Sequence, residues 1–234
     1  MLILALDAST DAATVAVACA EENTEPGSGR EVLAAISAHS RSASETLLPA
    51  THTALSLAGT NLSEVERIVV GVGPGTFTGI RIALSTARSL ALATDATLSR
   101  NSTLNALAAP ALLSMEEPEA LAVLDAKRRQ VFAQRFAGDR MYGEILCLTP
   151  EELAVELTAG DPPLVVGDGA VIYREVLSVL GHIPPDASPL HQVTAVGHVL
   201  SADLTPVSPH EVVPLYVRAP DAEARRDLNP WSKT

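Results

Sequence analysis

Short apolar runs separated by polar turns predict three strands in the first forty residues. One apolar run covers residues 2–6, and a run of small apolar residues covers 14–20 after a short polar connection. Two such runs joined by a short link predict a β-hairpin. A third strand is predicted over 32–38, after a loop rich in Pro, Gly and Ser.

Two helices with a short buried strand between them are predicted next. Apolar residues recur at helical spacing over 44–58, with Pro49 inside the pattern. Because an interior proline lacks a backbone donor and clashes with the preceding turn, we expect a kink or a late start there. The apolar run 68–70 then predicts a strand, and residues 78–94 again have the spacing of a helix.

The opening pattern returns halfway along the chain. Residues 121–136 run from an apolar strand through Asp-Ala and a polar connection into a second strand, and Asp125 takes the position that Asp7 has in the first hairpin. A buried-looking strand over 163–170 and a helix over 171–180 follow. Because the order of elements repeats, we predict an α/β fold with two duplicated, hairpin-led lobes and helices on mixed sheets.

Local patterns mark the lobe boundaries and the starts of ordered elements. We place the first lobe at 1–100 and a smaller second lobe at 101–218, and we expect the polar stretch 219–234 to be a mobile tail. Two pairs of polar residues have capping-box spacing: Ser63 with Glu66, and Thr149 with Glu152.

Charge and composition limit the classes of function. The chain has 16 basic and 28 acidic residues, a net charge of -12, and such a field repels nucleic-acid backbones. Unaided nucleic-acid binding is therefore not expected. The opening residues are too weakly apolar for a signal or membrane segment, so we expect a cytoplasmic protein without membrane contact. Cys19 and Cys147 lie far apart and are interpreted as core residues.

The glycine-rich stretch "GVGPGTFTG" begins at Gly71, directly after a strand and before a helix, where phosphate-binding loops occur. Its spacing matches neither a dinucleotide fingerprint nor a P-loop, since no lysine precedes Lys127. Backbone N–H groups at the helix start would still permit weak anion binding. We favour a structural role for Gly73, Gly75 and Gly79, in which glycine permits unusual backbone angles and close packing.

The ionisable residues do not form a recognisable catalytic set. Asp7 and Asp125 each end an apolar strand, where a carboxylate can hold magnesium or orient water, but neither is followed by a glycine that would let a phosphate approach. We interpret Asp7, Ser9 and Asp125 as structural or vestigial phosphate-loop positions. No pair of the six histidines has the i, i+4 spacing of a helical zinc site. No catalytic residue or metal ligand is therefore assigned.

The helix predicted over 78–94 carries a stripe of small residues. Ala83, Ala87 and Ala91 recur every four residues, and such a stripe lets another helix approach closely. The stripe fits packing onto the chain's own sheet, and it also fits contact with a helix of a partner protein.

Six segments, taken in order, resemble the TsaB family of bacterial tRNA-modification proteins: "LALDAST", "HSRSASETLLP", "GVGPGTFTGIRIALSTARSLA", "LDAKRRQVFAQRF", "VVGDGA" and "PLYVR". The run from Gly73 to Arg81 is the specific part, and the looser remainder extends to about residue 218. The resemblance implies the two-lobed, actin-like (ribonuclease H-like) fold of sugar kinases. It also implies an accessory subunit of the machinery that makes threonylcarbamoyladenosine beside the tRNA anticodon.

The same resemblance implies a set of partners. The catalytic subunit TsaD, a paralogue, would contact the helices at 44–58 and 78–94, and a second copy of the chain would do so in its absence. A TsaE-type ATPase would join the complex, tRNA would be reached only through it, and ATP would lie at the interface or in the partner, with no cofactor in the isolated chain. The interface residues expected are Leu48, Leu55, Arg81, Leu84, Ala87, Arg88 and Ala91.

A noncatalytic role is part of what the resemblance implies. TsaD carries a His-x-x-x-His metal site, and the two histidine positions fall at about Thr103 and Leu107 here, neither of which can replace an imidazole. Three alternatives stay open. They are a small-molecule kinase of the same superfamily, a metallopeptidase, and a self-associating α/β scaffold with another client.

Overall fold

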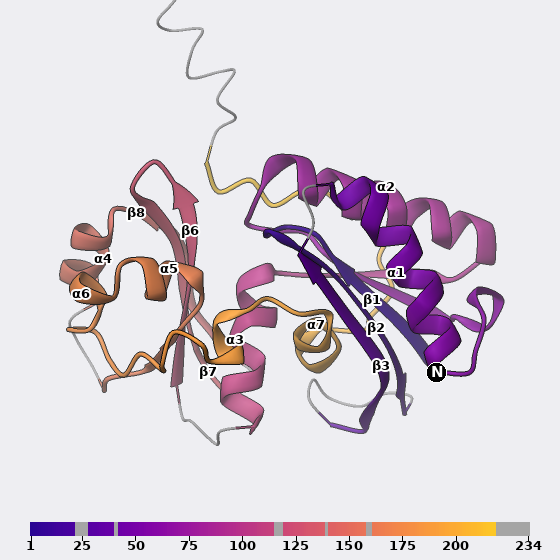
Figure 1. Ribbon diagram of the computed structural model, residues 1–234, viewed down its shortest axis with the longest axis horizontal. Coiled ribbons are helices and arrows are strands. Elements are labelled where there is room, and N and C mark those ends of the chain that lie inside the picture. Colours follow the sequence, from indigo (N-terminus) through magenta and orange to yellow (C-terminus); the bar gives the residue numbers. More distant parts are fainter. Residues whose placement is uncertain (22–27, 40–41, 115–118, 139, 158–160, 219–234) are drawn as a thin grey trace, which may run out of the picture.

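Two β-sheets built in the same strand order form the frame of the two lobes (Figure 1). The computed structural model describes residues 1–21, 28–39, 42–114, 119–138, 140–157 and 161–218. The first sheet has five strands in the order β3-β2-β1-β4-β5, and the second has four in the order β8-β7-β6-β9. The predicted tail, 219–234, lies outside the described residues.

The first sheet joins an antiparallel half to a parallel half. Its strands are β1 (Leu2–Asp7), β2 (Ala12–Ala20), β3 (Arg30–His39), β4 (Arg67–Gly71) and β5 (Thr97–Asn101). β2 pairs antiparallel with β1 and β3, and β4 pairs parallel with β1 and β5. β1 and β4 are almost entirely apolar because both of their faces are covered. The four strands predicted in this region are confirmed, and β5 adds a fifth.

The second sheet repeats this arrangement. Its strands are β6 (Glu119–Lys127), β7 (Gln130–Ala137), β8 (Arg140–Leu148) and β9 (Leu164–Val166). β6 pairs antiparallel with β7 and parallel with β9, as β1 does with β2 and β4. The turns after β1 and β6 also contain the same hydrogen bond. The backbone N–H of Ser9 donates to Asp7 Oδ1 at 2.7 Å, and that of Lys127 donates to Asp125 Oδ1 at 3.0 Å. The predicted duplication is confirmed.

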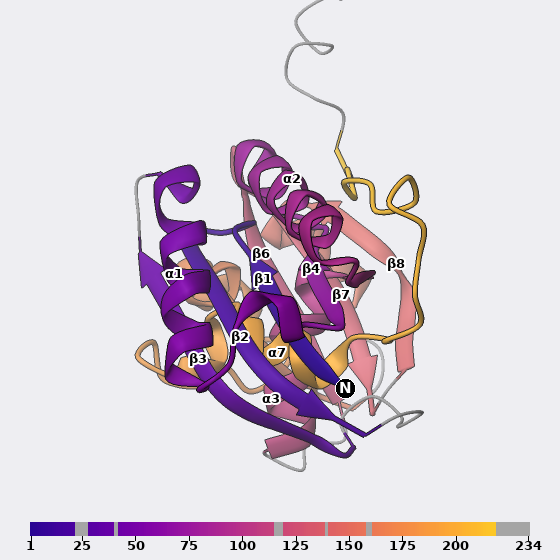
Figure 2. The same cartoon turned by 90° about the vertical axis from the view of Figure 1, so that its right-hand side faces the viewer.

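Helices fill three layers around the two sheets (Figure 1), and Figure 2 looks onto the first lobe with α1 and α2 in view. The helices are α1 (Ala43–Leu57), α2 (Phe77–Thr94), α3 (Thr103–Ser114), α4 (Pro150–Glu156), α5 (Asp168–Ile172), α6 (Arg174–Leu177) and α7 (Ala195–Ser201), with short 3-10 turns at Leu62–Glu64 and Pro189–His191. α1 and α2 cover the outer face of the first sheet. α7 packs on its inner face, α3 packs on the inner face of the second sheet, and the two helices contact each other. α4, α5 and α6 cover the outer face of the second sheet.

Four apolar clusters lie between these layers, one on each face of each sheet. α3 is apolar on nearly every side because it packs on the second sheet and on α7 at once. The approach of α3 to α7 is close at Gly197, where a Cβ atom would lie 2.0 Å from the backbone oxygen of Ala106. The helix α7, which lies within the sequence "VTAVGHVL", is thus the inner helix through which the first lobe packs against α3 of the second.

Several local predictions need correction. Pro49 lies well inside α1, so that helix has no late start. The capping box before β4 is formed by Asn61 and Glu64, whereas the Glu66 side chain accepts a hydrogen bond from the backbone N–H of Leu2. The predicted helix at 171–180 is two short helices, α5 and α6. The capping box of Thr149 with Glu152 at the start of α4 is confirmed.

The last described segment returns to the first lobe. α7 packs against β1, β2 and β3, and Val207 forms a β-bridge with Leu98 on the outer edge of β5. Residues 195–218 therefore pack largely on the first lobe, although the boundary predicted from chain order assigns them to the second. In the described part of the chain, no helix is long and apolar enough to cross a membrane.

Candidate functional site

Asp7, the carboxylate at the end of β1, is enclosed by the protein itself. Its exposed fraction is 0%. One oxygen, Oδ1, accepts hydrogen bonds of 2.7 Å from the Ser9 backbone and hydroxyl, and the other, Oδ2, lies 3.1 Å from His198 Nε2. Thr103 reaches the same group from α3, with its hydroxyl 3.0 Å from that of Ser9. A Cβ atom on Gly71 would lie 1.7 Å from Asp7 Oδ2, so β4 closes the remaining side.

Asn101 determines which nitrogen of His198 carries the proton. The amide oxygen of Asn101 accepts a 3.0 Å hydrogen bond from the Asn105 side chain, so its Nδ2 group faces His198 Nδ1 at 3.2 Å and Ser201 Oγ at 2.8 Å. Nδ2 is a donor, and His198 Nδ1 is therefore the acceptor. It follows that Nε2 carries the hydrogen and donates it to Asp7.

The network keeps the Asp7 carboxylate ionised. Burial acts to raise its pKa, but the hydrogen bonds from His198 and Ser9 outweigh burial, and the pKa of Asp7 lies below its ordinary value. A carboxylate with every approach occupied by protein groups has no open face for a magnesium ion or a phosphate. The structural interpretation of Asp7 and Ser9 is therefore the one that the geometry supports.

The glycine loop packs against the same turn after β1. Gly73 has φ +101°, a region that favours glycine. A Cβ atom at Gly75 would lie 2.3 Å from the backbone oxygen of Ser9, and one at Gly79 would lie 1.8 Å from that of Ala8. The space beside the loop, where a phosphate would sit in a nucleotide enzyme, is taken by the chain's own backbone. The predicted structural role of these glycines agrees with this packing.

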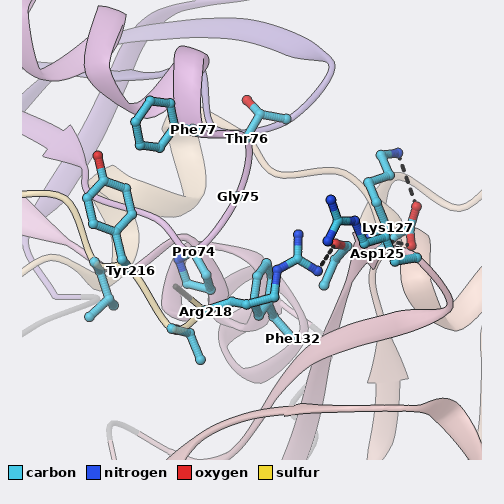
Figure 3. Close-up of a pocket in the computed structure, with 13 residues that line it drawn as sticks. Pro74, Gly75, Thr76, Phe77, Asp125, Lys127, Phe132, Tyr216 and Arg218 are labelled. Atoms are coloured by element: carbon cyan, nitrogen blue, oxygen red, sulfur yellow. Dashed lines mark hydrogen bonds and ion pairs between the residues drawn. The ribbon is translucent and has the colours of Figure 1, made fainter. Parts of the chain in front are cut away.

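A cleft of about 440 Å³ lies between the lobes (Figure 3). The glycine loop from Pro74 to Phe77 lines one side together with residues 215–218, and the turn from Asp125 to Arg128 lines the other with Phe132. Three cationic side chains face it, from Lys127, Arg128 and Arg218. The described residues that line this cleft come from short loops, from strands β6 and β7, from the start of α2 and from the last described segment.

Asp125 lies at this cleft but is tied to its own turn. Its Oδ2 atom forms an ion pair with Lys127 Nζ at 3.0 Å, and this contact raises the pKa of Lys127. Its backbone N–H donates to Asp168 Oδ1 at 2.9 Å. Burial, and to a lesser degree the neighbouring Asp125 charge, raise the pKa of Asp168. Asp125 is partly exposed, in contrast to Asp7. The carboxylates at the two equivalent strand ends therefore differ in their surroundings.

The two positions that correspond to the histidine pair of TsaD lie inside the protein. Thr103 and Leu107 are on the first turns of α3 and are fully buried. Within the described ranges, no group of three or more His, Cys, Asp or Glu side chains is placed to hold a metal ion.

The seven residues expected at a partner interface divide into two groups. Leu55, Leu84, Ala87 and Ala91 are buried in the apolar cluster between the first sheet and its outer helices. The alanine stripe of α2 therefore packs on the chain's own sheet, the first of its two interpretations. Leu48, Arg81 and Arg88 lie on the outer surface of α1 and α2, and the side chain of Leu48 is 52% exposed.

Two of the exposed arginines contact the C-terminal segment. Arg81 lies 3.7 Å from the centre of the Phe77 ring, and its Nε donates to the Tyr216 hydroxyl at 2.9 Å. Phe77 and Tyr216 stack with ring centres 5.4 Å apart. Arg88 donates to the backbone oxygen of Val212 at 2.6 Å. The outer surface of α2 is thus continuous with residues 212–218, which sequence patterns did not identify as functional.

The sequence comparisons identify relatives with one named role. Residues 35–158 match the family described as TsaD, tRNA N6-adenosine threonylcarbamoyltransferase. The chain is 27% identical over 188 residues to the tRNA threonylcarbamoyladenosine biosynthesis protein TsaB of Haemophilus influenzae. This match covers 75% of each chain. It is 26% identical to the TsaB protein of Bacillus subtilis over 96% of this chain and 97% of that one.

Solved structures show the same fold. YeaZ from Pseudomonas aeruginosa matches with a TM-score of 0.71 and 28% identity over 92% of this chain and 99% of that chain. The ROK hexokinase of Thermus thermophilus matches with a TM-score of 0.51 and 16% identity over 86% of this chain and 98% of that chain, a likeness of fold alone. The two-lobed, sugar-kinase-like architecture is confirmed.

Proposed function

Because the chain belongs to the TsaB family and takes part in tRNA threonylcarbamoyladenosine biosynthesis, we propose that it is the noncatalytic subunit that binds and activates the catalytic subunit TsaD. The observation that carries the proposal is the enclosure of Asp7. The strand end that would serve a nucleotide in a kinase of this fold is filled by Ser9, Thr103 and His198.

The surface proposed for TsaD is the outer face of α1 and α2. Three leucines are exposed on these two helices: Leu48 and Leu57 on α1, and Leu92, which is 86% exposed, on α2. Arg88 lies one helical turn before Leu92 on α2. Exposed apolar side chains together with arginine fit a protein interface, whose core is apolar and enriched in arginine. The same face would bind a second copy of the chain when TsaD is absent.

Further partners follow from the same proposal. A TsaE-type ATPase would join the assembled complex, and tRNA would contact the chain only as part of it. The net charge of -12 supports this order of assembly, because a chain of this charge gains little from phosphate contacts by itself. Nucleotide would be held by the partner or at the shared interface, with none in the isolated chain.

The proposal is tested by reconstitution. TsaD and this chain, mixed with tRNA, the threonylcarbamoyl donor and the TsaE-type ATPase, should form threonylcarbamoyladenosine, whereas the same mixture without TsaD should form none. A product formed by this chain in the absence of TsaD would refute the noncatalytic role. Micromolar ATP binding by the isolated chain in calorimetry would instead support the kinase alternative.

Asp125 offers a sharper test of the noncatalytic role. Asp125→Asn in this chain should leave the rate of the reconstituted reaction within twofold of the wild type. The reason is that the carboxylate is paired with Lys127 on the chain's own turn, and the proposed role gives it no part in the reaction. The variant and wild type should be compared at equal occupancy of the complex. A rate loss of a hundredfold or more would make Asp125 a catalytic residue and contradict the proposal.

A further inference from the structure

The segment 202–218 is fastened to the first lobe along its length. Val207 pairs with Leu98 on the free edge of β5, and the side chain of Val212 is fully buried in the cluster beneath α2. Arg100 donates to the backbone oxygen of Glu211 at 3.0 Å. Farther on, the backbone N–H of Leu215 donates to the oxygen of Val72 at 2.8 Å, directly before the glycine loop.

The same segment then crosses to the second lobe. Val217 packs against the cluster on the inner face of the second sheet. Arg218 Nη1 donates to the backbone oxygen of Ala126 at 3.1 Å and to Gln130 Oε1 at 3.2 Å. Ala126 is near the end of β6 and Gln130 begins β7, so the two acceptors lie on either side of the turn between these strands. Residues 212–218, which we call the clasp, therefore have one apolar anchor in each lobe and span the mouth of the cleft between them (Figure 3).

Besides the clasp, the described residues join the lobes through a second region of close packing. It is the packing of α3 on α7, with Gly197 against Ala106 and with the buried network around Asp7. In Figure 1 this helix pair lies between the two sheets, and the clasp, drawn in yellow, crosses above it. The helix pair is buried and tightly packed, whereas the clasp lies at the surface with Tyr216 41% exposed. The surface connection is the weaker of the two.

We propose that the clasp sets the separation of the two lobes and couples it to the first turn of α2. Release of Val217 and Arg218 lets the second lobe swing away about the α3–α7 contact. The stack of Tyr216 on Phe77 and its hydrogen bond from Arg81 transmit that movement to the start of the partner-binding helix. This last step rests on the proposed function, whereas the control of lobe separation does not.

The lobe separation is measured with two spin labels in the full chain. Cys19 is exposed on β2 and Cys147 is partly exposed, so the interpretation of both as core residues is wrong. Cys19 can therefore carry one label, and Glu151→Cys on α4, in a chain that also carries Cys147→Ala, places the second label on the other lobe. Electron–electron resonance should show a narrow distance distribution with the intact clasp. Arg218→Ala and Val217→Ala, separately and together, should shift the distribution to longer distances and broaden it. Arg100→Ala, which loses an anchor on the first lobe only, should leave it unchanged.

The outcomes separate the two proposals. An unchanged distribution in the double variant would overturn the clasp, whether or not TsaD binds. Val217→Ala and Arg218→Ala change partly exposed side chains, and their melting temperatures verify that both fold. If the distance shifts and the affinity for TsaD falls at least threefold, the coupling to α2 is supported. A shifted distance with unchanged affinity would overturn the coupling step, and failure of the wild-type chain to bind TsaD would refute the proposed function while leaving the lobe measurement valid.

Discussion

Asp7→Asn is expected to lower the free energy of unfolding by roughly 1 to 3 kcal/mol, the usual cost of leaving a buried hydrogen-bonding group unpaired. The new amide group must face either the donors of Ser9 or the Nε2–H of His198, so a donor meets a donor at one side. Equilibrium unfolding in urea at pH 7 measures the difference. Asp11→Asn, the same chemical change at an exposed position four residues on, serves as the control and should change stability by less than about 0.5 kcal/mol.

The pH dependence of this difference follows from the pKa of Asp7. Folding lowers that pKa, so the carboxylate stabilises the native state fully at pH values above its unfolded pKa, about 3.9. The stabilisation is lost as pH falls through the folded pKa. The gap between wild type and Asp7→Asn should therefore be constant from pH 7 to pH 5 and shrink only below about pH 4. A gap that closes between pH 7 and pH 6 would mean that the network depends on a different titrating group.

Leu48→Asp combined with Leu92→Asp is expected to weaken binding to TsaD at least a hundredfold. A charge at each exposed leucine must be desolvated when the helices meet their partner, and the few residues that dominate an interface each cost about 2 kcal/mol or more when changed. Surface plasmon resonance with immobilised TsaD gives the two affinities. The chain itself should keep its melting temperature, because the side chains are 52% and 86% exposed.

The matched control for the interface is on the other lobe. Val155 on α4 is 79% exposed, and Val155→Asp makes the same apolar-to-acidic change far from α1 and α2. It should leave binding within twofold of wild type. Equal losses in the control and in the α1–α2 variant would show that charge, and not the location of the leucines, governs binding. Changes at Ala87 or Ala91 would be uninformative, because both side chains lie in the core and a large charged residue there would unfold the chain.

Local patterns predicted the elements whose stability comes from nearby residues. The three hairpin-led strands, α1, α2 and the capping box of Thr149 are each specified within a few positions. The short elements β5 and α7 were missed because they are ordered by packing on the first sheet and not by their own periodicity. The helix expected at 171–180 breaks at Tyr173, where the backbone leaves helical geometry between α5 and α6.

The site was less predictable, since its residues come from distant parts of the chain. His198 meets Asp7 across 191 positions, and no spacing rule connects a histidine on a short helix to a strand end. The same is true of Arg218 and the turn at Ala126. For the alanine stripe of α2 the difficulty was different. Its spacing was visible, but only the location of the first sheet decides that Ala87 and Ala91 face inward.

The measurement that tests the central claim most directly is the amount of threonylcarbamoyladenosine in bulk tRNA from cells depleted of this protein. Mass spectrometry of digested tRNA should show a large loss of the modified nucleoside, restored by the wild-type chain and by Asp125→Asn but not by the combined Leu48→Asp and Leu92→Asp variant. An unchanged level of the modification after depletion would contradict the account.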